Sequence, residues 1–307
     1  MDISTRKGIT KMKIGFIGLG VMGSRMVKRF LEAGYQVLVY NRTPEKAQSL
    51  VRLGAQRAVD IASLTKQSDV VCTCLSMPKD SMSVFLGEDG VIQHAKEGTI
   101  CLDFSTVGAD TSQQISAEAI KKGVFFLDAP VSGGPEGVEQ GTLTIMVGGD
   151  KEAFTIVHPI LNAIGKNIEY LGNSGSGSIA KLINQYLVAV HSIAASEAMV
   201  AGAAFGLDSE QLYNLLKVSY GNSRMLERHM EQYVLDRLFE PGGAVKYVHK
   251  DVKLANQLFE KAGINEKLGL LAENSFSNAI HQGLADLDMS AVIQPLEEQC
   301  GVVVKRK

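Results

Sequence analysis

The chain has 307 residues, which is enough for about two domains of ordinary size. Hydrophobic residues make up 45% and charged residues 21%, the composition of an ordinary soluble globular protein. A net charge of -2, an aromatic content of 6% and the lack of Trp argue against nucleic-acid binding, because they provide neither a basic surface nor stacking platforms. No apolar run reaches the ~20 residues of a transmembrane helix, so we expect no membrane partner.

The N-terminal residues 1–12 are polar and do not form a secretory signal, and residues 1–11 are interpreted as a short extension or an artefact of the assigned start. Cys72, Cys74 and Cys101 lie in apolar runs, which indicates reduced core thiols in a reducing cytosol. No cluster of His or Cys accompanies Cys72 and Cys74, so we expect no metal site. These features predict a cytoplasmic protein.

The first part of the chain alternates short apolar runs with segments of helical spacing. Strands are expected at residues 13–18, 36–40, 69–75, 99–104 and 124–127, with two more at the sheet edge at 142–148 and 167–171. Helices are expected at residues 21–33, 44–53, 81–86 and 109–122. This alternation predicts an α/β fold of the Rossmann type, with a mostly parallel sheet covered by helices on both faces.

The pattern changes at a glycine- and serine-rich stretch, residues 172–178, which is either a flexible linker or a loop that leads into a helix. A long helical pattern without proline follows at residues 179–205. Further helices are expected at residues 209–220, 224–235, 246–261 and 266–281, and no strand pattern occurs there. We therefore predict a dinucleotide-binding Rossmann domain at residues 12–173 and an all-α domain for substrate binding and dimerisation at residues 174–307.

A glycine-rich motif of the G-x-G-x-x-G type follows the first expected strand and opens a helix. Its residues are Gly18, Leu19, Gly20, Val21, Met22 and Gly23. The first glycine permits a tight turn, the second lets the backbone approach a pyrophosphate, and the third allows close helix packing. The helix N-terminus supplies N–H donors and a positive dipole end. A glycine turn without a ligand is the alternative, but the strand–turn–helix context predicts dinucleotide binding.

The end of the second expected strand indicates which dinucleotide binds. NAD sites usually place Asp or Glu there, about 20 residues after the glycines. This chain has Asn41, Arg42 and Thr43, so no carboxylate repels a 2′-phosphate. Arg42 can pair with that phosphate or stack on adenine, while Asn41 and Thr43 can donate hydrogen bonds. We predict NADP(H), with NAD(H) less favoured; the alternative is that Arg42 is a solvated turn residue.

Hydride transfer to a carbonyl also needs an acid and an anchor for the substrate. Lys181 lies in the first turns of the long helix, and Asn184 and Gln185 follow on the same side of that helix. A lysine in a cleft near a helix N-terminus is a better acid, although most helical lysines are solvated charges. Ser132, with the amides of Gly133 and Gly134, can cradle a carboxylate after the strand at residues 124–127; a tight loop that needs glycine for its backbone angles is the alternative.

Four blocks in this order resemble the β-hydroxyacid dehydrogenases, which include 3-hydroxyisobutyrate dehydrogenase, tartronate semialdehyde reductase and glyoxylate/succinic semialdehyde reductase. The resemblance covers residues 13–293. Its blocks are residues 15–23, residues 128–134 continuing to 141–143, the G-x-G-x-x-x-K-x-x-N pattern at 175–184, and the K-D-x-x-L-A pattern at 250–255.

The resemblance implies a role for each matching residue. Lys181 would be the general acid and base, and Ser132 with Gly133 would bind the substrate carboxylate. Thr106 would contact the nicotinamide side, Met77 and Pro78 would line the cofactor cleft, and Lys250 would reach the cofactor from the helical domain. Gln185 departs from the pattern, because many members have Asn there. Tartronate semialdehyde reductases resemble this chain in that Asn-Gln pair, which leaves open whether Asn184 or Gln185 holds the substrate.

These features predict an oxidoreductase that transfers a hydride between NADP(H) and a small hydroxy-carboxylate, whose oxidised partner is a semialdehyde or a 2-oxo acid. One rival is an NADPH-dependent imine reductase, and another is a dinucleotide-binding module without catalysis; Lys181 argues against both. The apolar faces of the long helix, together with the resemblance, predict a homodimer or homotetramer.

Overall fold

The computed structural model describes residues 12–306, so the extension expected at residues 1–11 lies outside the described part. The chain forms two compact units, of which unit 1 ends at Lys181 and unit 2 begins at Leu182. The division falls inside helix α9 (Ser176–Ala204). The domain boundary expected between residues 173 and 174 therefore stays a prediction.

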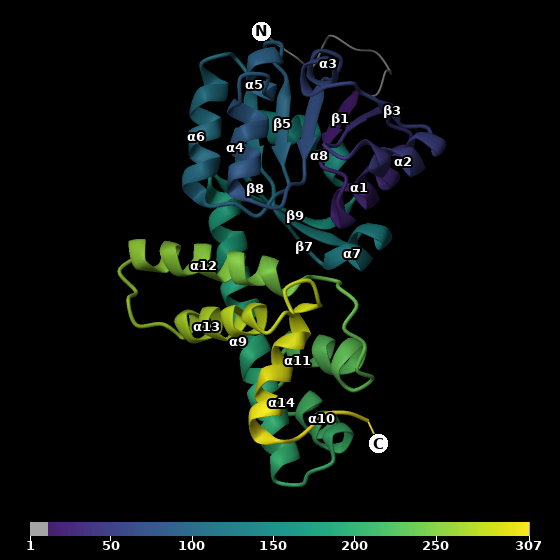
Figure 1. Ribbon diagram of the computed structural model, residues 1–307. Helices are drawn as coiled ribbons and strands as arrows, with labels where there is room; N and C mark the ends of the chain where they lie inside the picture. Colours follow the sequence, from purple (N-terminus) through teal and green to yellow (C-terminus); the bar gives the residue numbers. More distant parts are fainter. Residues whose placement is uncertain (1–11, 307) are drawn as a thin grey trace. The chain divides into compact units, whose positions relative to one another are not determined.

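Unit 1 contains a mostly parallel sheet whose described strands follow the order β3-β2-β1-β4-β5-β6-β8-β7, with β9 paired to β8 (Figure 1). The six strands from β3 to β6 are parallel, β8 is antiparallel to β6 and β7, and β9 is parallel to β8. The strands are β1 (Ile14–Ile17), β2 (Val37–Tyr40), β3 (Gln56–Arg57), β4 (Val70–Thr73), β5 (Ile100–Asp103), β6 (Phe125–Asp128), β7 (Val131–Ser132), β8 (Leu143–Gly149) and β9 (Gly165–Gly172).

Helices cover both faces of this sheet because successive side chains of the central strands point to opposite faces and enter two separate buried cores. Phe16 packs with residues of α1 (Val21–Glu32), α2 (Gln48–Arg52), α7 (Gly134–Gln140) and α8 (Lys151–Leu161). Ile17 packs with residues of α3 (Ile61–Lys66), α4 (Pro78–Leu86), α5 (Val91–His94) and α6 (Ala109–Ile120). A 3-10 turn, Pro44–Ala47, precedes α2. The predicted α/β class with helices on both faces is confirmed.

Residues 172–178 form the short connection into a helix rather than a linker. Strand β9 ends at Gly172 and α9 begins at Ser176. By length and composition α9 is able to cross a membrane, and 44% of its most apolar 18-residue window is buried inside the structure. Core helices have the same length and composition, so this feature alone does not indicate a membrane span.

Unit 2 contains only helices and turns among its described residues, apart from one isolated bridge between Ala244 and Asp288. The rest of α9 packs there in two apolar clusters, one around Phe276 and one around Met199. The other elements are α10 (Ser209–Lys217), α11 (Arg224–His229), a π-helical turn (Met230–Val234), α12 (Val245–Lys261), α13 (Leu268–His281), a 3-10 turn (Met289–Ile293) and α14 (Gln294–Cys300). The all-α prediction is confirmed, and it missed the last two of these elements.

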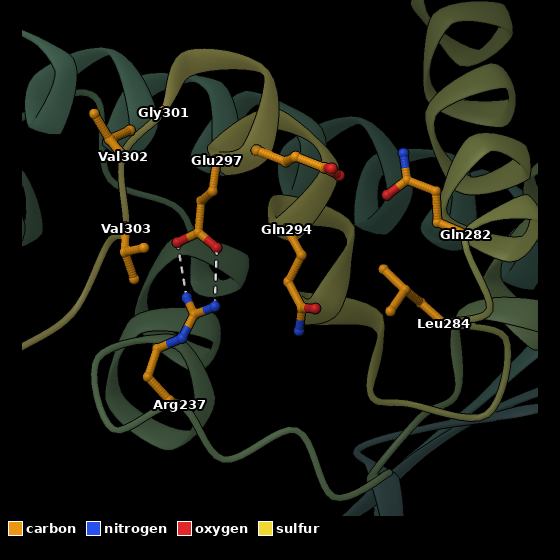
Figure 2. A pocket seen from close by; sticks show the side chains of 9 residues that line it. Arg237, Gln282, Leu284, Gln294, Glu297, Gly301, Val302 and Val303 are labelled. Carbon is orange, nitrogen blue, oxygen red and sulfur yellow. Dashed lines mark hydrogen bonds and ion pairs between the residues drawn. The ribbon is translucent and has the colours of Figure 1, made fainter.

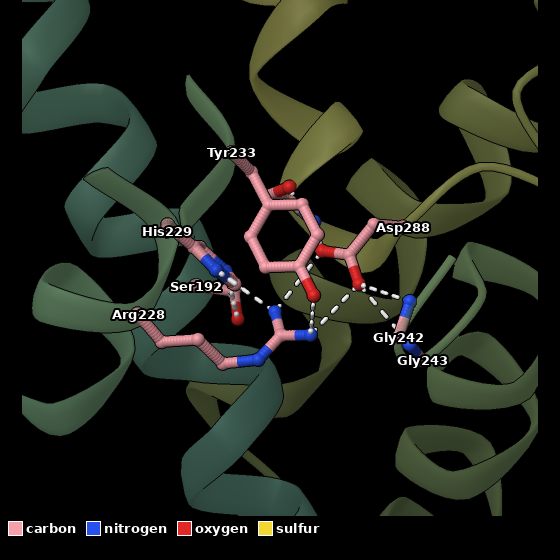
Figure 3. Close-up of polar contacts among 8 residues, drawn as sticks. Ser192, Arg228, His229, Tyr233, Gly242, Gly243 and Asp288 are labelled. Carbon is pink, nitrogen blue, oxygen red and sulfur yellow. Dashed lines mark hydrogen bonds and ion pairs between the residues drawn. The ribbon is translucent and has the colours of Figure 1, made fainter. Parts of the chain in front are cut away.

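A buried polar network joins α11 to the turn before the last helices (Figure 3). The Arg228 guanidinium donates to both carboxylate oxygens of Asp288, at 3.0 and 2.8 Å, and to the Tyr233 hydroxyl at 3.1 Å. Asp288 also accepts the N–H groups of Gly242 and Gly243. The network gives hydrogen-bond partners to the Asp288 carboxylate, which is fully buried and would be costly without them.

Candidate functional site

The loops that carry the predicted residues of unit 1 leave the sheet along one edge. The parallel register places Tyr40, Ile17, Thr73, Asp103 and Asp128 in one row across β2, β1, β4, β5 and β6. The next residues along each strand begin the loops that contain the predicted site residues. Since β2 and β4 flank β1, the strand order reverses there, and open α/β sheets bind ligands at the carboxyl ends of the strands at such a point.

Each glycine of the dinucleotide motif has a separate structural reason. Gly18 has φ +98° and a Cβ there would lie 2.4 Å from the Cys74 carbonyl oxygen. A Cβ on Gly23 would lie 2.0 Å from the Gly18 oxygen, so α1 packs against the turn only without a side chain. A Cβ on Gly20, by contrast, would meet nothing within 4 Å. Open space at Gly20, at the start of α1, fits the approach of a pyrophosphate.

Asn41 joins the glycine loop to the end of β2. Its Oδ1 accepts the Leu19 N–H at 2.9 Å, and its Nδ2 donates to the Thr43 carbonyl at 3.0 Å. These bonds give Asn41 a role in holding the glycine loop, and its direct donation to a phosphate stays a prediction. Arg42 is exposed at the adjacent position and makes no hydrogen bond or ion pair with another residue of the described 12–306 segment. Its guanidinium therefore faces solvent in this structure.

The loops after β4 and β5 are tied together beneath their exposed ends. The Leu75 N–H donates to the Ser105 hydroxyl at 2.8 Å. Buried Asp103 accepts the Thr73 hydroxyl at 2.7 Å and the Ser105 N–H at 3.0 Å; burial raises the pKa of its carboxyl and these donors oppose that rise. This pairing sets the paths of two loops, one leading to Met77 and Pro78 at the start of α4 and one to half-buried Thr106.

The predicted substrate loop contains more regular structure than the sequence indicates. Val131 and Ser132 form strand β7, and α7 begins at Gly134. Gly133 and Gly134 have φ +131° and +66°, so glycine is required for the backbone angles, as one of the two alternatives states. Ser132 is half-buried and pairs with Thr144 of β8.

Helix α7, which follows the substrate loop, contacts α1, which follows the glycine loop. The Arg25 guanidinium on α1 donates to the Glu139 carboxylate on α7 at 2.6 Å. The two loops that would hold cofactor and substrate therefore belong to one packed assembly within unit 1.

Lys181 is 7% exposed and lies in the second turn of α9, after the buried residues Gly177 and Ser178 of the first turn. Its helix is fixed by Asp128, the last residue of β6. One carboxylate oxygen of Asp128 accepts the Gly175 N–H at 2.7 Å, and the other accepts the Ser178 N–H at 2.8 Å. Burial raises the pKa of the Asp128 carboxyl, and both N–H donors oppose this rise. The helix that carries Lys181 and the predicted substrate loop are thus anchored at one residue.

The remaining predicted residues lie in unit 2. Buried Gln185 donates from Nε2 to Asp251 at 2.5 Å and accepts the Asn184 amide at 3.0 Å. Lys250 pairs with the other oxygen of Asp251 at 2.8 Å. The Gln185 amide is therefore engaged in holding α12 against α9. Asn184 is half-buried and still has its side-chain oxygen to offer.

A hollow in unit 2 lies away from these residues. It measures about 520 Å³ and lies beside Arg237, Gln294 and Glu297 (Figure 2). Arg237 donates to both oxygens of Glu297, at 2.7 and 2.9 Å, so its charge is neutralised by a structural partner. Among the described residues no cluster of His, Cys, Asp or Glu is arranged to hold a metal ion. None of the residues predicted for catalysis, substrate binding or cofactor binding lines this hollow.

Sequence reasoning gave no role to Asp128 or Asp103. Both are acidic residues at the ends of apolar runs, a position at which an ionisable side chain is buried unless the following loop turns it outward. An acidic residue at the end of an apolar run is a candidate for a buried structural role, but this position does not show which groups the carboxylate binds. The partners of Asp128 lie 47 and 50 residues further along the chain.

The fold and the matches to known proteins identify a dehydrogenase that uses a nicotinamide cofactor. Residues 13–172 match the family described as the NAD binding domain of 6-phosphogluconate dehydrogenase. Residues 175–296 match the family described as NAD-binding of NADP-dependent 3-hydroxyisobutyrate dehydrogenase. The chain belongs to the β-hydroxyacid dehydrogenase family.

Named relatives match nearly the whole chain. NAD-dependent L-serine dehydrogenase of Pseudomonas aeruginosa is 35% identical, over 91% of this chain and 96% of the relative. The 2-hydroxy-3-oxopropionate reductase of Escherichia coli is 34% identical, over 93% and 97%. The crystal structure of 3-hydroxyisobutyrate dehydrogenase from Salmonella typhimurium superposes with a TM-score of 0.85 at 31% identity, covering 93% of this chain and 100% of the other. A reductive aminase from Aspergillus terreus, at 20% identity and a TM-score of 0.61, shares the fold alone.

Proposed function

We propose that the chain is an NADP(H)-preferring dehydrogenase that interconverts a small hydroxy-carboxylate and its semialdehyde or 2-oxo counterpart. Lys181 is the proposed general acid and base, and Ser132, Gly133 and Gly134 the proposed carboxylate site. The observation that carries the proposal is that Asp128 anchors both elements: it ends the strand before the substrate loop and binds the first amides of the helix that bears buried Lys181.

The residues of this chain suit the steps that a bound dinucleotide leaves to the protein. When bound, the nicotinamide supplies or accepts the hydride. In reduction, the Lys181 ammonium gives a proton to the carbonyl oxygen as it becomes an alkoxide, and the resulting amine regains a proton from water. In oxidation, the Lys181 amine removes the hydroxyl proton. Ser132 and the Gly133 and Gly134 amides hold the carboxylate, which fixes the reacting carbon.

The substrate class follows from chemistry shared by the relatives' names. L-Serine, 3-hydroxyisobutyrate and 2-hydroxy-3-oxopropionate are all short carboxylates with a hydroxyl or oxo group on carbon 3. We assign a substrate of that class here. Since the Gln185 amide is bound to Asp251 and Asn184, we assign the substrate contact to Asn184 and a supporting role to Gln185. Lys250 is the proposed cofactor contact from the helical part.

The preference for NADP(H) rests on exposed Arg42 and on the lack of a carboxylate at the end of β2. Asn41 contributes by holding the glycine loop, and Thr43 and the Met77, Pro78 and Thr106 loops complete the proposed cofactor site. A cytoplasmic location, the absence of nucleic-acid and membrane partners, and assembly as a homodimer or homotetramer belong to the same proposal.

The proposal is tested by following NADPH consumption with tartronate semialdehyde, methylmalonate semialdehyde, succinic semialdehyde and glyoxylate. Propionaldehyde, which lacks the carboxylate, is the matched control, and a cyclic imine represents the rival chemistry. We expect turnover of at least one carboxylate substrate and a loss of about 10² or more in kcat/KM for propionaldehyde. Turnover of the imine alone would identify an imine reductase. NADPH binding without turnover of any of them would leave a binding module.

A further inference from the structure

Asp128 lies where three functional segments meet. It is 1% exposed and ends β6, four residues before Ser132. Its two carboxylate oxygens accept one N–H each, from Gly175 at 2.7 Å and from Ser178 at 2.8 Å. Those are the amides at the start of α9, which have no partner inside the helix. Asp128 therefore acts as an N-terminal cap supplied by a distant strand, and its negative charge faces the positive end of the helix dipole.

The surroundings of this carboxylate leave it little freedom. A Cβ on Gly148 would lie 2.8 Å from Asp128 Oδ1, and one on Gly177 would lie 3.0 Å from Oδ2 and 2.2 Å from the Met146 carbonyl oxygen. Two glycines are thus required for β8 and α9 to close around Asp128. Because the packing is this close, a change in the Asp128 carboxylate should shift the start of α9.

A second contact ties the same helix turn to the nicotinamide side. The hydroxyls of Ser178 and Ser112 are 2.9 Å apart, and both residues are fully buried. Ser112 belongs to α6, which begins shortly after Thr106. Ser178 therefore binds Asp128 through its backbone and α6 through its side chain, three residues before Lys181. The contacts of Ser178 with Asp128 and Ser112 therefore connect the segments that carry the proposed acid, the substrate loop and Thr106.

We propose that Asp128 is a positioning residue for the reaction: it fixes the start of α9 so that Lys181 meets a substrate held at Ser132. The inference rests on the proposed function, because it requires Lys181 to be the acid. Each carboxylate oxygen of Asp128 accepts one backbone N–H group, so the cap needs an acceptor at both oxygens, and the Ser178 side chain also hydrogen-bonds this carboxyl. In Asp128→Asn, one acceptor becomes an NH₂ group that faces an N–H donor, so one end of the cap is lost while the side-chain shape is kept.

The first measurement counts active sites and compares rates per site. NADPH fluorescence titration gives the number of folded, cofactor-binding molecules, and kcat is expressed per such molecule. We expect Asp128→Asn to lower kcat per site by about 10², the cost of a misplacement near 1 Å, with the KM for NADPH within about twofold of wild type. Amide hydrogen exchange at residues 175–181 should accelerate in the variant without cofactor.

The second measurement is a double-mutant cycle with Lys181→Ala. If Asp128 acts through Lys181, Asp128→Asn lowers kcat no further once Lys181 is absent. Multiplicative losses would overturn the inference, as would unchanged kcat per site in Asp128→Asn. A Lys181→Ala enzyme with near wild-type activity would instead contradict the proposed function, so the two failures are distinguishable.

Two further variants keep the test decisive. Should Asp128→Asn fail to fold, Ser112→Ala removes only the hydroxyl contact to Ser178; it should lower kcat per site by several-fold, and its effect should also vanish in the Lys181→Ala background. Asp288→Asn changes another buried carboxylate, in unit 2, that accepts the backbone N–H groups of Gly242, Gly243 and Ser290. It should lower stability and leave kcat per site within about twofold; an equal loss in Asp288→Asn would show that any damaged carboxylate cap reduces turnover.

Discussion

Asn41 and Arg42 have different roles at the end of β2. Asn41 binds the Leu19 N–H and the Thr43 carbonyl, so it shapes the glycine loop. Arg42 is exposed beside it and offers a planar donor fork, which suits a phosphate. A preference for NADP(H) should therefore depend mainly on Arg42, while Asn41 should affect the binding of both cofactors.

Replacing Arg42 by Ala should weaken NADPH by about 10- to 100-fold and NADH much less, since a charge-assisted phosphate contact is lost. The measurement is kcat/KM for both cofactors in wild type and variant. Asn41→Asp retains an acceptor for the Leu19 N–H while adding a charge that repels the 2′-phosphate, so it should move the preference further toward NADH. Equal losses for NADPH and NADH in Arg42→Ala would show that Arg42 only stacks on adenine.

Residues with local roles could be predicted from the sequence, and residues with distant partners could not. The roles of Gly18 and Gly23 follow from a motif within a few residues, and the structure shows the close contacts that require them. The competing uses of Asn184 and Gln185 could not be separated, because the deciding partner, Asp251, lies 66 residues beyond Gln185. Asp128 had no assigned role for the same reason.

At the scale of elements, α11 and the π-helical turn after it are held by the network around Arg228. Fully buried His229 lies 2.9 Å from the Ser192 hydroxyl through Nε2, and its Nδ1 lies 3.5 Å from an Arg228 nitrogen (Figure 3). Arg228 can only donate and Ser192 donates to the Val188 carbonyl, so Nε2 carries the hydrogen and the ring is neutral. Burial, aided by the Arg228 charge, lowers the pKa of His229 to about 3.

Stability should therefore fall as the solution becomes acidic. The unfolded chain protonates this side chain near pH 6.5 and the folded chain only near pH 3, so between these values the unfolded state binds the extra proton. The contribution of His229 is complete above pH 6.5 and declines by ~1.4 kcal/mol per pH unit as the pH falls toward 3. Urea unfolding followed by circular dichroism from pH 7.5 to 5 measures this slope.

Two variants isolate the histidine. His229→Gln cannot titrate, so its unfolding free energy should depend less on pH between 6.5 and 5 than that of wild type. Ser192→Ala removes a hydrogen-bond partner but leaves the ring buried, and it should lower stability at every pH while keeping the slope. A wild-type slope in His229→Gln would assign the acid sensitivity to other groups.

Among the elements, segments with a clear apolar pattern could be predicted, whereas α8, the two-residue strand β7 and the short helix α7 could not. The helix expected at residues 109–122 corresponds to α6, and the helix expected at residues 246–261 to α12. Strand β7 has two residues and owes its conformation to pairing with β8, while α7 begins with glycines that the sequence pattern assigns to a loop. In both cases tertiary pairing outweighs local preference.

At the scale of the molecule, α9 carries an apolar stripe that unit 2 leaves uncovered. Ile183 and Leu187 are 45% and 48% exposed, and the exposed alanines at positions 194, 198 and 201 continue the same helical face. Small side chains permit close approach of another helix. A second copy of the chain is the partner that the proposed homo-oligomer supplies.

Ala198→Glu should therefore convert the oligomer to smaller species at micromolar concentration, because the interface would bury an unpaired charge. Light scattering measures the molar mass of wild type and variant. Ala117→Glu makes the same chemical change on the exposed face of α6 in the other unit and should leave the mass unchanged. A wild-type protein that is already monomeric would remove the proposed homo-oligomer.

Lys181 is the proposed general acid and base of a nicotinamide-dependent hydroxy-carboxylate dehydrogenase, and the proposed function depends most on this residue. Pre-steady-state turnover of Lys181→Ala with the best carboxylate substrate tests it most directly, with Lys166→Ala, an exposed lysine of β9, as the matched control. We predict a rate at least ~10² lower in Lys181→Ala, with NADPH affinity close to wild type, and a normal rate in the control. Activity of Lys181→Ala within a few-fold of wild type would contradict the account.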